Sequence, residues 1–198
     1  YYLMADHRFA NPKDESIPGA GKLALILFIA SLAMLFGASI IGYLVVRLRA
    51  EAWPPPGMPR LPSGLWFSTV IIIFSSVFIQ RAQNAIRMDL LNKSKWNLLF
   101  SYVLGILFLA VQTMNWYGLI TAKIENMENL YLFTFFMLTG LHAVHVLGGL
   151  IPLGVVTIRS FRDRYSSQYH PGIEYNVMYW HFLLIVWLIM FGILLSAG

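Results

Sequence analysis

The chain has 198 residues, of which 58% are hydrophobic and only 12% are charged. That is too little polar surface to coat a soluble domain, and the apolar residues come in long blocks, so the composition predicts an integral membrane protein. The 14 Lys and Arg that give a net charge of +5 are scattered singly between those blocks, which argues against nucleic-acid binding. The absence of cysteine excludes disulfides, thiolate metal sites and thiol nucleophiles.

Five apolar stretches are long enough to cross a bilayer, which needs about 20 residues per helix. Each must be helical, because lipid offers backbone amides no other hydrogen-bond partners. A proline-rich run from Trp53 to Pro62 separates the first two spans, and Pro152 predicts a kink within the fourth. The predicted fold is all-α, an integral membrane bundle of five transmembrane helices (residues 22–198) behind a polar N-terminal segment (residues 1–21). The expected spans are residues 22–46, 64–86, 98–121, 130–158 and 175–196.

The distribution of basic residues predicts the direction of the bundle. Ten of the 14 Lys and Arg fall in the leader, the second loop and the fourth loop, and the other four lie on the opposite side. Because cytoplasmic loops carry the excess of Lys and Arg, we expect a cytoplasmic N-terminus and a periplasmic C-terminus.

Polar side chains interrupt the last two spans, where they are costly unless a partner protein, a lipid headgroup or water receives them. His142, His145 and Gly149 share one face of the fourth helix, within an arc of about 60°. Glu174 and His181 lie two turns apart on one face of the fifth helix.

Three interpretations of these imidazoles remain open on spacing alone. His142 or His145 could ligate a b-type heme together with His181. A metal site is a second interpretation, although Glu174 is the only other ligand nearby. The third is that each imidazole makes a structural hydrogen bond, and the spacing favours it because histidines one turn apart on one helix cannot straddle a porphyrin.

Ordered motifs cover the second half of the chain. They comprise the run from Gly140 to Val146, Arg159 followed by the run from His170 to Glu174, and the run from Tyr179 to Phe182 followed by Trp187. This set resembles cytochrome c oxidase subunit III, the heme-free membrane subunit of heme-copper oxidases. Longer members of that family have seven helices, and five here resembles a short bacterial form that lacks the first two.

Three positions depart from the family's pattern. Where the family usually carries carboxylates inside the bilayer, this sequence has Leu32, Asn115 and Leu184. Membrane carboxylates commonly hold or relay protons. Their loss predicts that this chain carries no protons of its own, while a stabilising and lipid-holding role survives.

The resemblance implies an accessory subunit with no cofactor of its own, in a bacterial plasma (inner) membrane that it crosses several times. Its expected partners are a large subunit that bears the hemes and copper, other oxidase subunits, phospholipid and a respiratory supercomplex. A lipid-filled, V-shaped cleft is expected, with Arg159 on a lipid phosphate and with polar contributions from His170, Glu174, His142, His145 and His181. The alternatives are a heme b-ligating, quinone-reactive membrane anchor and a small transporter, which would want a broken helix or a water-lined ionisable path.

Overall fold

The protein is described here by a computed structural model, which places residues 20–55, 62–121, 130–165 and 170–196. Most of the predicted polar leader and the middle of the proline-rich run lie outside these residues. All five predicted spans are confirmed as helices, and each is long and apolar enough to cross a bilayer. They are α1 (Ala20–Arg49), α2 (Gly64–Arg87), α3 (Leu91–Thr121), α4 (Leu130–Phe161) and α5 (Pro171–Leu195).

Two helices begin earlier than their apolar blocks. α3 starts at Leu91 rather than at residue 98. A polar turn precedes its apolar block, and a contact with α2 holds that turn in place. Ser94 Oγ in that turn donates a hydrogen bond to the carbonyl of Ala82 in α2, at 3.0 Å. α5 starts at Pro171, since a proline suits the first helical turn, where its missing N–H has no helical partner. α4 continues through Pro152 without ending.

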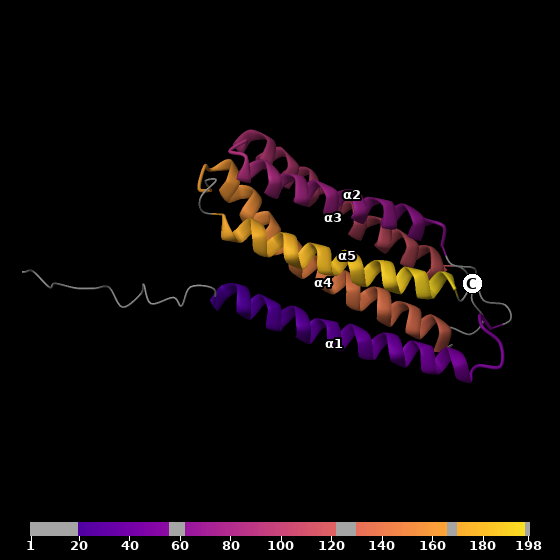
Figure 1. Cartoon of the computed structure of the whole chain (residues 1–198). Coiled ribbons are helices and arrows are strands. Elements are labelled where there is room, and N and C mark those ends of the chain that lie inside the picture. The colour runs from indigo at the N-terminus through magenta and orange to yellow at the C-terminus, as the bar shows by residue number, and fades with distance from the viewer. Residues whose placement is uncertain (1–19, 56–61, 122–129, 166–169, 197–198) are drawn as a thin grey trace, which may run out of the picture.

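The helices lie side by side along one direction, with α5 in the middle (Figure 1). α5 contacts α1, α2 and α4, whereas α2 packs most extensively on α3. In Figure 1, α1 forms one edge of the bundle, and within the described residues it contacts only α4 and α5. α1 is therefore the least buried helix, and most of its apolar surface faces outward.

Two fully buried tryptophans of α5 fix this helix against the rest of the bundle. Trp187 Nε1 donates to Thr69 Oγ1 at 2.9 Å, and Trp180 Nε1 donates to Ser75 Oγ at 3.0 Å. Both acceptors belong to α2. Interhelical hydrogen bonds and close packing hold membrane helices together, because lipid is as apolar as the helix surfaces and leaves little hydrophobic drive.

Glycines make room for the large rings of α5. A Cβ built on Gly149 of α4 would lie 2.6 Å from Cε1 of Tyr179, and one on Gly105 of α3 would lie 2.9 Å from Cζ2 of Trp180. These contacts are tighter than any methyl group tolerates. The small residues therefore set how closely α3 and α4 approach α5.

The bundle has one strongly basic end. The start of α1, the α2–α3 turn and the end of α4 lie together at that end, and the C-terminus of α5 lies at the other (Figure 1). The described cations of the basic end are Lys22, Arg81, Arg87, Lys93, Lys95, Arg159, Arg162 and Arg164, against Arg47 and Arg49 at the opposite end. The predicted orientation across the membrane depends on this asymmetry, and it stays a prediction.

Gly149→Ala should destabilise the bundle by roughly 1–3 kcal/mol, because the new methyl would overlap the Tyr179 ring. That ring cannot easily move, since its hydroxyl donates to the carbonyl of His145 at 3.0 Å. Gly148→Ala is the matched control, because a Cβ there meets nothing within 4 Å. Thermal unfolding in detergent should show a loss for Gly149→Ala and none for Gly148→Ala; equal midpoints would contradict the packing role.

Candidate functional site

Glu174 lies at the surface of the basic end, in the first turn of α5. Its Oε1 is 3.0 Å from Nη2 of Arg87 in α2 and 3.6 Å from Nε2 of His170. Both side chains of the Arg87–Glu174 pair are about half exposed, so water screens the attraction and the pair contributes little stability. The Arg87–Glu174 pair joins the end of α2 to the first turn of α5.

His181 bridges α5 and α2 inside the membrane-spanning part of the bundle. Its Nε2 lies 2.9 Å from Oε1 of Gln80, and its Nδ1 lies 2.6 Å from Oγ of Ser76. Because an amide oxygen can only accept, Nε2 carries the proton, and the neutral ring accepts from Ser76 at Nδ1. The side-chain amide of Gln80 donates hydrogen bonds to Oε1 of Gln83 at 3.2 Å and to Oδ1 of Asn84 at 3.1 Å. Both ring nitrogens of His181 are therefore used in a hydrogen-bond chain along α2.

His142 is fully buried in an aromatic enclosure. Its ring centroid lies 5.1 Å from that of Trp187, 5.8 Å from Phe108 and 6.1 Å from Phe36. Neither ring nitrogen has a hydrogen-bond partner among the residues that the structure places. The imidazole acts here as an aromatic packing group between α1, α3, α4 and α5.

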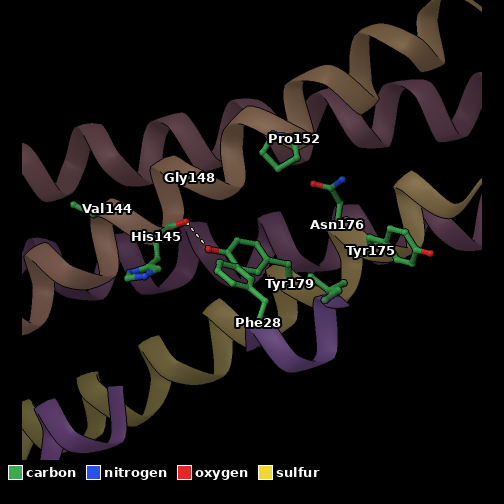
Figure 2. A pocket seen from close by; sticks show the side chains of 9 residues that line it. Phe28, Val144, His145, Gly148, Pro152, Tyr175, Asn176 and Tyr179 are labelled. Carbon is green, nitrogen blue, oxygen red and sulfur yellow. Dashed lines mark hydrogen bonds between the residues drawn. The ribbon is translucent and has the colours of Figure 1, made fainter. Parts of the chain in front are cut away.

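His145 lies one turn further along α4, beside an open cavity of about 390 Å³ between α1, α4 and α5. Its Nδ1 donates to the carbonyl of Leu141 at 2.7 Å, which leaves Nε2 as an acceptor. Figure 2 shows His145, Gly148 and Pro152 of α4 facing Tyr179 of α5, with Phe28 of α1 against the Tyr179 ring. The lining is almost wholly apolar. We call this space the α1/α4/α5 cavity; its lining is completed by Leu25, Val144, Tyr175 and Asn176.

Arg159 is exposed in the last turn of α4, and no described residue pairs with its guanidinium. At 100° per residue it falls on the same face of α4 as Gly148 and Pro152, which line the α1/α4/α5 cavity. It lies about 10 Å beyond Pro152 along the helix axis. The cavity therefore leads toward a free cation at the basic end of the bundle.

The structure does not gather the predicted polar residues into one site. His145 lies at the α1/α4/α5 cavity, His142 lies in the core and His181 lies in the α2–α5 contact. Glu174 and His170 form a separate cluster at the surface. Only Arg159 and His145 lie on or near one apolar space.

The three positions at which the resemblance implies carboxylates lie in packed surroundings. Leu32 is buried in the core, Leu184 packs against it, and Asn115 is buried beside Gly64 of α2. Within the five helices Glu174 is the sole acidic residue, and it lies in a first turn. The described spans therefore contain no carboxylate in their middle turns.

Several residues that organise this region were not predicted as site residues. Ser75 and Ser101 exchange hydrogen bonds between α2 and α3, and Gln112 Nε2 donates to Ser68 at 2.9 Å. Their signal in the sequence is the set of hydroxyl and amide groups in α2 at helical spacing, from Ser68 to Asn84. Hydroxyls are common in membrane helices, so spacing alone did not identify their partners.

The described residues include no group of three or more His, Asp or Glu close enough to hold a metal ion. Comparison with known proteins then gives the decisive observation. The sequence profile described as cytochrome c oxidase subunit III matches residues 6–196. The chain belongs to this family.

Relatives named cytochrome c oxidase subunit 3 agree with the profile. The one from Synechocystis sp. is 33% identical over 177 residues, which are 88% of this chain and 74% of the relative. The one from Thermostichus vulcanus is 32% identical over 194 residues, which are 97% of this chain and 92% of the relative. The one from Drosophila melanogaster is 30% identical and is longer, with 65% of its length matched. Subunit III chains near this length therefore occur among the relatives.

Buried His142 and half-buried His181 should respond differently to apolar replacement. His181→Leu leaves Ser76 and Gln80 without their partner and should destabilise the bundle by about 1–2 kcal/mol. His142→Phe should leave stability unchanged or raise it, because its ring already packs among aromatic side chains.

Thermal unfolding of the two variants in one detergent measures both effects. Ser76→Ala combined with His181→Leu is the control, since the double variant should lose less than the sum of the single losses. A large loss for His142→Phe would contradict its assignment as a packing group.

Proposed function

We propose that this chain is an accessory, cofactor-free subunit of a respiratory heme-copper terminal oxidase. In this role it stabilises the large catalytic subunit and holds structural phospholipid. Its membership of the subunit III family supports the oxidase assignment. The α1/α4/α5 cavity, with Arg159 beyond its end, is the single observation that carries the lipid role.

The cavity suits an acyl chain, and Arg159 suits a phosphate. An apolar lining gives hydrocarbon a dry surface, and a guanidinium at the membrane interface forms charge-assisted hydrogen bonds with phosphate oxygens. Because no described residue pairs with Arg159, its charge is available to a headgroup. The helix C-terminal dipole also favours a cation at this place.

The exposed apolar surface of α1 supports a protein partner. Leu27, Met34 and Ile41 are 60, 70 and 62% exposed along this helix, which contacts only α4 and α5 in the described part of the chain. Packing against another membrane helix covers such a surface. In this proposal the large subunit, which bears the hemes and copper, lies against the bundle and performs the redox chemistry.

The proposed location is a bacterial plasma (inner) membrane, crossed five times, with the basic end in the cytoplasm. This direction gives a cytoplasmic N-terminus and a periplasmic C-terminus, as the positive-inside rule requires. The further partners in this proposal are other oxidase subunits and a respiratory supercomplex. Nucleic acid is not among them, because the cations that the structure places lie near the helix ends.

The heme-ligating alternative requires His181 as one ligand, and the surroundings of His181 do not favour this role. Both ring nitrogens of His181 already take part in hydrogen bonds, so binding iron would break its bond to Ser76 or to Gln80. His142 is enclosed by three aromatic rings, which leave no open face for a porphyrin. A transporter pathway has no support either, since α4 stays helical through Pro152.

The isolated chain should bind no heme, copper or iron, because its spans offer no suitable ligand set. Visible absorption of the purified subunit and elemental analysis measure this. The assembled oxidase is the positive control and should show its heme bands. A Soret band or stoichiometric metal on the isolated chain would overturn the proposed role.

Arg159→Ala should leave the initial turnover of the oxidase near normal, because it touches no redox group, and should make activity decay faster as bound lipid is lost. The measurement is a time course of oxygen consumption, with phospholipid counted in each preparation. Arg81→Ala is the control, since Arg81 is an exposed cation of the same end that stands over Phe78 and away from the cavity. Equal lipid content and equal decay in all preparations would remove Arg159 from the lipid role.

A further inference from the structure

A second apolar groove runs along the outside of the bundle between α3 and α4. Two adjoining hollows of about 320 and 410 Å³ share Tyr102, Gly154 and Ile158, so they form one continuous channel. We call it the α3/α4 groove. It has no lining residue in common with the α1/α4/α5 cavity. Its remaining lining residues are Leu99, Ile106, Leu109, Leu147, Leu150, Ile151, Val155, Thr157, Phe161 and Arg162.

The length of the groove matches one leaflet of a bilayer. On α4 the larger of the two hollows extends from Leu147 to Ile158, a rise of about 16 Å at 1.5 Å per residue, and the smaller one continues from there to Phe161 and Arg162. Half of a hydrocarbon core about 30 Å thick is about 15 Å. An acyl chain lying in the groove would therefore reach from the interface at the basic end to the middle of the membrane.

The depth of the groove depends on a glycine. A Cβ on Gly154 would lie 3.1 Å from Cε2 of Tyr102, so the glycine lets the Tyr102 ring lie close to α4. The Tyr102 hydroxyl has no acceptor among the described residues. Thr157, by contrast, donates its hydroxyl to the carbonyl of Leu153 and adds no free polar group. The wall thus offers hydrocarbon contact along its length and one free hydroxyl donor.

A cation stands at the interfacial end of the groove. Arg162 lines the groove directly, and no described residue pairs with its guanidinium. The nearest carboxylate in sequence, Asp163, is instead 2.7 Å from Nζ of Lys95 in α3. That pair neutralises itself, so the charge of Arg162 remains for an anion at the membrane surface.

We propose that the α3/α4 groove binds one anionic phospholipid of the leaflet at the basic end, with its phosphate on Arg162 and an acyl chain along Gly154 and Ile158. The lipid would fill the hollow between two helices whose own side chains leave it open. This inference rests on the chain spanning a bilayer and does not depend on the role proposed for Arg159. It assigns α4 two lipid-binding faces, each ending in its own arginine.

Photocrosslinking in the native membrane complex tests the site. The complex is placed in phosphatidylcholine vesicles that contain a minor fraction of phosphatidylglycerol with a diazirine at the end of one acyl chain. Crosslinks mapped by mass spectrometry should concentrate on the α4 segment from Leu147 to Ile158. Arg162→Gln should lower their yield by about tenfold, the effect of losing one charge-assisted hydrogen bond.

A second variant tests the groove itself. Ile158→Trp should lower the crosslink yield by filling the groove from its exposed side, where Ile158 is 55% exposed and supports no core contact. Lys93→Gln and Val103→Trp are matched controls, because both residues are exposed and neither lines the groove. Both controls should retain the yield of the unmodified chain.

The mapped positions separate this site from the one at Arg159, because Arg159→Ala should leave these crosslinks unchanged. An unchanged yield in Arg162→Gln would overturn the proposal. Crosslinks spread evenly over all outward-facing helices would do so too, as would their absence from the α3/α4 groove in the assembled complex.

Discussion

The bundle depends on the contact between the tryptophans of α5 and the hydroxyls of α2. Trp187 on Thr69 and Trp180 on Ser75 provide polar bonds in a setting where apolar burial gives helices little reason to associate. The rings can occupy these places only because Gly105 and Gly149 have no side chain. Hydrogen bonds thus tie α5 to α2, close packing ties it to α4, and the Trp180 ring reaches across to α3.

The polar groups in the middle turns of the described spans do not include a carboxylate. Polar groups inside the spans are hydroxyls, amides and imidazoles, most of which pair with one another, although the ring nitrogens of His142 do not; the one acidic residue of the helices, Glu174, lies at the surface. A bundle without a carboxylate in its middle turns has no group that stays charged in hydrocarbon.

α4 connects the stable core of the bundle with its lipid surface. Its buried side carries His142 and Gly149 toward α5, while its outer sides carry Pro152 to one apolar hollow and Gly154 to another. Arg159 and Arg162 follow at the basic end of these two faces. Lipids proposed at both places would extend the packing of the bundle outward, where its own side chains leave gaps.

The sequence by itself determined the all-α fold, the five spans and the family, because apolar block length and ordered motifs are local properties of the chain. It missed the first turns of α3 and α5, where polar residues and Pro171 continue a helix beyond the hydrocarbon. Only the tertiary structure decided which polar residues meet. His142, His145 and His181 look alike in the sequence, yet one lies among aromatic rings, one beside a cavity and one between two α2 side chains. Their surroundings come from neighbouring helices, whose rotation about their own axes depends on close packing and is not encoded in any single span.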